Sequence, residues 1–220
     1  MEYAEHLIQR ILDAPDHSRV AVLANELLRE FQRGYSVERL RPLLASYDGG
    51  IVATAAWIAS ELAETARPLL SEVVPLLKHP AKRVRFHALD CLFWASIEQG
   101  SELAAAFRLL GDADSGVRWK AMHLLASLSA EKLRAGLRFL AQSEGDAELA
   151  RGLSWLISSE AERPEMILAA LGSDDAIMRR FAALAAARNR TELLGDVSTS
   201  GDDEVSEFAR GKMRLAQQSA

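Results

Sequence analysis

The chain has 220 residues, of which 49% are hydrophobic and 26% are charged, and its formal net charge is −5. This composition is sufficient for a packed core, and the acidic balance argues against nucleic-acid binding through overall charge. One cysteine, Cys91, excludes an intramolecular disulfide. Cys91 lies in an apolar helical stretch, so we expect a buried residue rather than a nucleophile. The first residues, MEYAEHLIQRILDAP, lack the apolar run of a signal peptide, and we expect a cytoplasmic protein of bacterial origin without a membrane segment.

A sequence repeat runs along most of the chain. Residues 76–92 align with residues 109–125 at an offset of 33, which places Val84 over Val117 and Ala88 over Ala121. Apolar residues within each copy recur at helical spacing rather than in alternation. The repeat therefore predicts a series of helical units instead of a β-sheet.

In chain order, the repeat predicts one domain of seven two-helix units. Their approximate ranges are 1–32, 33–65, 66–99, 100–129, 130–160, 161–187 and 188–220. The second helix of each unit carries an apolar anchor at residue 20, 51, 84, 117, 150, 178 or 205, and Ala or Ser four residues later. In the third unit we expect helices over residues 67–78 and 81–98. An aspartate stands three residues before four of the anchors, where it can cap the second helix: Asp48, Asp114, Asp175 and Asp202.

The order of Leu, Asp, Val-Arg and Ala resembles the short HEAT-like repeat of phycobilisome lyases. The resemblance covers nearly the whole chain and is strongest over residues 67–128. It implies an all-α fold, a right-handed α-solenoid of about seven two-helix HEAT-like repeats whose second helices line the concave side. It also implies a structural ladder, in which the arginine that follows the anchor of a repeat bonds the acids and carbonyls of the turns. The four ladder residues are Arg85, Arg118, Arg151 and Arg179.

Positions +2, +3, +6 and +10 from an anchor lie opposite the buried stripe of each second helix, so we expect them to face the groove. The candidate partner-binding residues there are Trp57, Phe86, His87, Asp90, Trp94, Trp119, Lys120 and His123. The same rule assigns Gly152, Leu153, Leu156, Arg180, Phe181, Leu184 and Arg188 to the groove. The alternative is that the aromatic residues pack between neighbouring helices. Two histidines in this patch would make binding depend on pH between about 5 and 7.

These features favour a non-catalytic protein–protein interaction module. We expect it to hold a partner with an acidic and apolar surface, as an adaptor, a regulator or a toxin-neutralising immunity protein, and to be a monomer or weak dimer. No cofactor and no catalytic residue is expected, and His87, Asp90 and His123 are interpreted as contact residues rather than metal ligands. One alternative is a HEAT-like DNA-binding protein or alkylpurine DNA glycosylase. Trp57, Asp90 and Arg118 resemble the tryptophan, acid and arginine that such glycosylases place on a concave groove. Another is a phycobilin-lyase-like enzyme.

Overall fold

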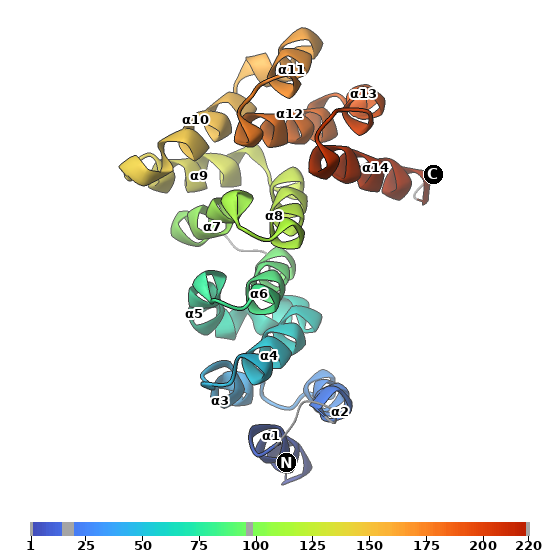
Figure 1. Cartoon of the computed structure of the whole chain (residues 1–220). Coiled ribbons are helices and arrows are strands. Elements are labelled where there is room, and N and C mark those ends of the chain that lie inside the picture. The colour runs from blue at the N-terminus through green and yellow to red at the C-terminus, as the bar shows by residue number, and fades with distance from the viewer. Residues whose placement is uncertain (1, 15–19, 96–98, 219–220) are drawn as a thin grey trace. The chain divides into compact units, whose positions relative to one another are not determined.

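The computed structural model describes residues 2–14, 20–95 and 99–218, and the regular elements in these ranges are all helices, with no β-strand among them (Figure 1). None of the helices in these ranges is long and apolar enough to cross a membrane. The α-helices are α1 (Glu2–Leu12), α2 (Val20–Gln32), α3 (Arg41–Leu44), α4 (Gly49–Glu61), α5 (Leu70–Val73), α6 (Lys82–Trp94), α7 (Gly100–Phe107), α8 (Ser115–Ser127), α9 (Ala130–Leu140), α10 (Ala147–Leu156), α11 (Pro164–Leu171), α12 (Ala176–Asn189), α13 (Leu194–Ser198) and α14 (Asp203–Gln218). The 3-10 helices are Val37–Leu40, Ala63–Leu69, Val74–Lys78, Arg108–Gly111, Glu144–Asp146, Ser159–Glu162 and Thr191–Leu193.

The chain divides into two compact units, Met1–Ile97 and Glu98–Ala220. Unit 1 contains α1 to α6, and unit 2 contains α7 to α14. Each unit is described by itself below. The division into seven repeats and the handedness of the solenoid stay predictions.

Unit 1 is built around three second helices of equal length, α2, α4 and α6, with α4 packed against both of the others. The predicted small residues lie at these contacts, and Ala24, Ala55 and Ala88 are buried. The anchor of each helix is buried as well, including Val84, and Val117 of unit 2 occupies the equivalent buried position. A methyl side chain at the contact lets two helix backbones approach closely, which is why the spacing of alanines predicted this packing.

The first helix predicted over residues 67–78 is broken into shorter pieces. Ala63–Leu69 is a 3-10 helix, α5 has four residues, and Val74–Lys78 is again a 3-10 helix. Pro68 lies inside the first of these segments and Pro75 at the start of the last. Proline has no backbone N–H to donate, so a continuous α-helix is unfavourable here. The second helix, predicted over residues 81–98, is α6, which begins at Lys82 and ends at Trp94. The predicted residues 96–98 lie outside the described residues.

All four predicted aspartate caps are confirmed. Asp48 accepts hydrogen bonds from the amides of Gly50 (2.7 Å) and Ile51 (3.2 Å). Asp114 and Asp175 do the same at α8 and α12, and Asp202 at α14. These carboxylates satisfy amides that have no acceptor within the helix, and they fix where each second helix begins. The corresponding position of α6 is Ala81, whose side chain provides no cap.

Unit 2 departs from the predicted register at the fifth repeat. Ser154, predicted to lie buried at a helix contact, is exposed, and the predicted anchor Ala150 is only half-buried. Leu149, Leu153 and Leu156 are buried instead. The register predicted for α10 is therefore wrong by one residue, and a bulky leucine takes the place expected for a small side chain.

Helix α12 lies at the centre of unit 2, where it packs against α8, α10, α11 and α14 (Figure 1). Residues 181–186 are all buried. They include Phe181 and Leu184, which their positions +3 and +6 from the anchor had placed in an open groove. Gly152 of α10 makes this possible, because a Cβ atom there would lie 2.2 Å from the Phe181 ring. The predicted groove face of the fifth and sixth repeats is thus a helix–helix contact, and that part of the prediction is wrong.

Two arginines of α12 bond directly to the backbone around α8. Arg180 donates to the carbonyl of Leu110 (3.0 Å), and Arg188 donates to the carbonyls of Leu125 and Leu128 (2.9 and 2.6 Å). The last carbonyls of a helix lack intrahelical donors, so Arg188 serves as a cap for α8. These residues were predicted to face the groove, but they hold α12 against α8.

Candidate functional site

A groove of about 670 Å³ lies in unit 1, across one side of α2, α4 and α6, and we call it the α2–α4–α6 groove. It is lined by Val20, Ala21, Ala24, Asn25, Gly49, Gly50, Ala53, Thr54, Trp57, Ala81, Lys82, Arg83 and His87. Its volume falls within the range of ligand-binding pockets. The groove is therefore the candidate site of unit 1.

The lining of the groove is mostly apolar. Ala21, Ala53 and Trp57 contribute hydrocarbon surface, and the glycines at the start of α4 contribute backbone. The polar side chains of the lining are bonded to their own helices: Thr54 donates to the carbonyl of Gly50 (2.9 Å), and Asn25 donates to that of Ala21 (2.7 Å). An incoming apolar group would therefore leave neither of these two donors unpaired.

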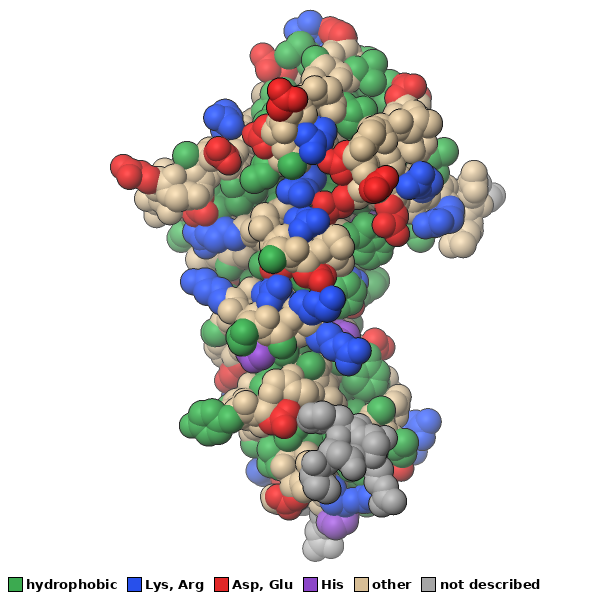
Figure 2. All heavy atoms as spheres, viewed as in Figure 1, with side chains coloured by type: hydrophobic (Ala, Val, Ile, Leu, Met, Phe, Trp, Pro, Cys, Tyr) green, Lys and Arg blue, Asp and Glu red, His purple; other side chains and the backbone are tan. Residues whose placement is uncertain are grey.

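Basic and acidic side chains are intermixed over the face of the molecule shown in Figure 2, so only the composition of the groove itself is informative. Among the described residues, its lining contains Lys82 and Arg83 and no carboxylate. All three helices also begin at the groove, since their first residues, Val20, Gly49 and Lys82, belong to the lining. The N-terminal end of a helix carries partial positive charge, although Asp48 offsets this at α4. The groove is consequently suited to a negatively charged occupant.

Two of the predicted binding residues, Trp57 and His87, line the groove, and three others on α6 do not. The ring of Phe86 packs edge-on to His87 with centroids 5.6 Å apart, and Asp90 is half-buried. Trp94 is 53% exposed near the other end of α6, where its ring meets that of Phe93 edge-on.

Sequence reasoning did not assign several lining residues to the site, namely Ala21, Asn25, Gly49, Gly50, Lys82 and Arg83. The basic pair at the start of α6 was a usable signal, because two adjacent cations at a helix N-terminus are unfavourable there without another role. Ala53 and Thr54 stand two and three residues after the anchor Ile51, so the rule of positions +2, +3, +6 and +10 places them on the groove side, where they line the groove.

The other predicted residues, Trp119, Lys120 and His123, belong to α8 in unit 2. The His123 ring lies 3.9 Å from that of Trp119 and 5.2 Å from that of Phe208 on α14. Burial, together with the charges of Lys212 and Lys120, lowers the pKa of His123 to about 4. His123 therefore stays neutral between about pH 5 and 7, and the expectation that it titrates in that range is wrong. That these residues and Trp57 form one patch stays a prediction.

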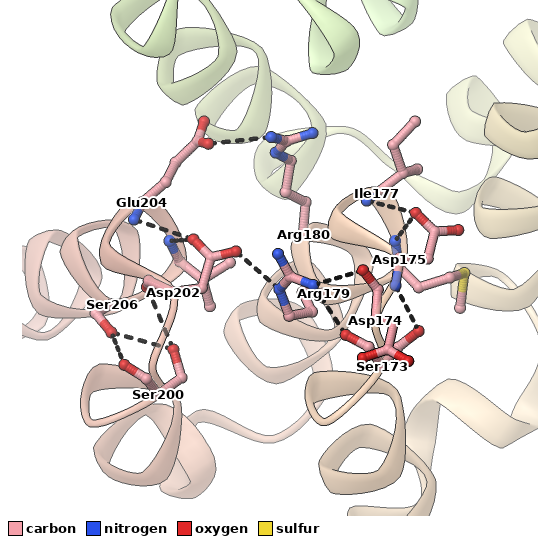
Figure 3. Close-up of polar contacts among 12 residues, drawn as sticks. Ser173, Asp174, Asp175, Ile177, Arg179, Arg180, Ser200, Asp202, Glu204 and Ser206 are labelled. Atoms are coloured by element: carbon pink, nitrogen blue, oxygen red, sulfur yellow. Dashed lines mark hydrogen bonds and ion pairs between the residues drawn. The ribbon is translucent and has the colours of Figure 1, made fainter.

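Three of the four predicted ladder arginines make the same contacts. Arg85, Arg118 and Arg179 each donate from Nη1 to the carbonyls five and six residues earlier, at 2.7 to 3.1 Å. Arg179 also bonds Asp202 at 2.8 Å (Figure 3). Arg151 differs, because its side chain is 65% exposed and forms only a 3.5 Å ion pair with Asp175. The first three arginines fix the turns between helices.

The chemistry available to these residues is limited. No group of three or more His, Cys, Asp or Glu side chains within the described residues is arranged to hold a metal ion. Cys91 is buried, and burial with the nearby charge of Asp90 raises the pKa of its thiol to about 12. A thiol in this state is not a nucleophile at neutral pH, as the sequence predicted.

No protein-family model matches the chain, and no curated protein matches it. Among solved structures, an engineered protein of the Northeast Structural Genomics Consortium is 19% identical and covers 99% of this chain and 98% of its own, with a TM-score of 0.51. A designed armadillo repeat protein in complex with the peptide (KR)4 is 14% identical, covering 97% and 99%, with a TM-score of 0.51. A HEAT-like repeats protein from Thermococcus onnurineus NA1 is 14% identical, covering 98% and 97%, with a TM-score of 0.50. The fold is thus an all-α solenoid of the kind found in HEAT-like and armadillo repeat proteins.

Proposed function

We propose that this protein is a non-catalytic interaction module that binds a segment of a partner protein in the α2–α4–α6 groove. The segment carries acidic and apolar side chains. The observation that supports this is the composition of the lining in the part of the chain that the structure describes: apolar surface around Trp57, the cations Lys82 and Arg83 at the start of α6, and no carboxylate. Tryptophan at the centre of a groove is a typical binding hot spot.

The dimensions favour a peptide segment. Packed helices lie about 10 Å apart, so three neighbouring second helices span roughly 20 Å. An extended chain rises about 3.3 Å per residue, and roughly six residues cross this distance. A designed armadillo repeat protein of similar fold is in complex with a basic peptide. The cations lining this groove favour the opposite charge in its occupant.

The glycosylase alternative requires an acid beside the aromatic residues. Asp90, the candidate acid, does not line the groove with Trp57, and only two of the described lining residues carry a fixed positive charge. Nucleic-acid binding depends on neutralising many phosphates, which this groove is poorly equipped to do. A cytoplasmic adaptor, a regulator or an immunity protein that covers a toxin are the roles we propose for such a module.

The test is a selection of displayed random peptides against the full chain, followed by affinity measurements on the selected peptides. We expect Trp57→Ala to weaken binding by more than about 1 kcal/mol, because the indole supplies the largest apolar surface of the lining. Trp94→Ala is the matched control, since Trp94 is exposed on α6 but outside the groove. Circular dichroism would verify that both variants fold. Equal losses for the two variants, or none for Trp57→Ala, would contradict the proposal.

A further inference from the structure

Lys212 of α14 is a half-buried cation for which the described residues provide no counter-ion. Its Nζ atom lies 5.5 Å from the centroid of the Phe208 ring, one helical turn earlier. Burial lowers the pKa of this lysine. Among the residues that the structure describes, no carboxylate forms an ion pair with it. Partial removal of an ammonium group from water is unfavourable unless a negative charge compensates for it.

The surroundings of Lys212 combine positive charge with apolar surface. His123 of α8 packs against Phe208, and Lys120 and Lys212 both act electrostatically on His123. His123 is neutral at physiological pH, so it adds no charge to this region. Leu215 lies three residues after Lys212, on the same side of α14, and is 51% exposed. On α8, the ring of Trp119 is half-buried and packs against His123 at an interplanar angle of 41°.

We propose that Trp119, Lys120, Lys212 and Leu215 form a second docking surface, the α8–α14 surface, which receives an acidic side chain of a partner protein flanked by an apolar one. A carboxylate gains more from a partly desolvated lysine than from a fully solvated one, because the local dielectric constant is lower. Trp119 on α8 and Leu215 on α14 supply apolar area for the flanking residue.

A protein partner fits this surface better than a nucleic acid. The surface offers two lysines, whereas nucleic-acid binding depends on neutralising many phosphates. A phosphate backbone would therefore meet few cations here. The proposal is independent of the α2–α4–α6 groove, because its residues all belong to unit 2.

The test uses the full chain with Trp57→Ala, so that the groove of unit 1 contributes little to binding. The probe is a fluorescein-labelled peptide of alternating Glu and Leu residues, measured by fluorescence polarisation. We expect Lys212→Met, which keeps the apolar stem of the side chain, to weaken binding about tenfold or more. Lys132→Met on α9 is the control and should leave binding unchanged. The same peptide with Gln in place of Glu should not bind.

Two further measurements separate a docking role from a structural one. Lys212→Met should melt at the same temperature or higher than the parent, because an uncompensated half-buried charge has been removed. The pKa of His123, followed by NMR, should rise in this variant because a neighbouring cation is gone. Absence of peptide binding by the parent, equal binding of the Gln peptide, or unchanged affinity in Lys212→Met would overturn the proposal. Stronger competition by oligodeoxythymidine than by the Gln peptide would assign the surface to nucleic acid instead.

Discussion

Glu204 of α14 joins three helices of unit 2 through one carboxylate, and Figure 3 shows its bond to Arg180 of α12. It accepts hydrogen bonds from Arg118 Nε of α8 at 2.9 and 3.0 Å and from Arg180 Nη2 of α12 at 3.2 Å. The three side chains retain only 12 to 18% of their exposure. Glu204→Gln keeps the shape of the side chain and removes its charge, which leaves two largely buried guanidinium groups without a counter-ion.

The size of the loss follows from these contacts. Removing one partner of a fully buried ion pair costs about 3–5 kcal/mol. Arg180 keeps its hydrogen bond to the carbonyl of Leu110, and Arg118 keeps that to the carbonyl of Asp112. With these acceptors and the residual exposure, we expect Glu204→Gln to lower the free energy of unfolding of unit 2 by roughly 2–3 kcal/mol.

The assay is urea unfolding followed by tryptophan fluorescence in a chain with Trp57→Phe and Trp94→Phe, so that only the tryptophans of unit 2 report. Glu165→Gln is the control, because Glu165 forms a 2.7 Å pair with Arg163 in which both side chains are more than half exposed. An exposed pair contributes less than about 1 kcal/mol. If Glu204→Gln costs no more than Glu165→Gln, the carboxylate does not join the three helices as described.

Three further predictions concern local features. The folded-state pKa of His123 is about 4, below its ordinary value, so His123 lowers the free energy of unfolding as the pH falls from about 6.5 toward 4 and has no such effect above about pH 6.5. After allowance for partial exposure, His123→Gln should remove about 1–2 kcal/mol of this loss. The measurement is the difference between the urea midpoints at the two ends of that pH range. Gly152→Ala should cost about 1–3 kcal/mol, because its Cβ would lie 2.2 Å from Phe181, whereas Gly195→Ala, with no atom within 4 Å of its Cβ, should not, and equal midpoints would refute the close contact. Ala63 has a φ of 50°, so Ala63→Gly should raise the thermal midpoint of unit 1 by the equivalent of about 1 kcal/mol, and a lower midpoint would argue against the left-handed backbone.

The features of the fold that the sequence predicted are those determined within one repeat. The aspartate caps and the buried alanines of α2, α4 and α6 follow from local helix geometry, and the structure places them as expected. The failure begins at α10, where the predicted anchor Ala150 still follows Val117 by 33 residues, but Leu149 and Leu153 are the buried residues. An error of one residue in the anchor turns the predicted faces of a helix by about 100°. The contact of Gly152 with Phe181 depends on how α10 and α12 pack against each other, which no pattern within one repeat specifies.

In the candidate site too, the features determined within one repeat were predicted and those that depend on packing between helices were not. The angular rule placed Trp57 and His87 on the groove side correctly within unit 1, because α4 and α6 keep the 33-residue spacing. Lys82 and Arg83 were not assigned to it, since their importance depends on where three helix starts meet in space. The contacts of His123 with Phe208 join segments 85 residues apart, and no local pattern in the sequence indicates them.

The central claim, that the α2–α4–α6 groove binds a partner segment, is tested most directly by site-specific photo-crosslinking. A benzophenone side chain would be placed at Ala21, which lines the groove, or at Val22, which is 63% exposed and does not. With a peptide selected against the full chain, we predict a crosslink from position 21 and none from position 22. Adjacent residues of one helix differ in direction by about 100°, so the comparison isolates the face of α2. Equal crosslinking from both positions, or crosslinking from position 22 alone, would contradict binding in the groove.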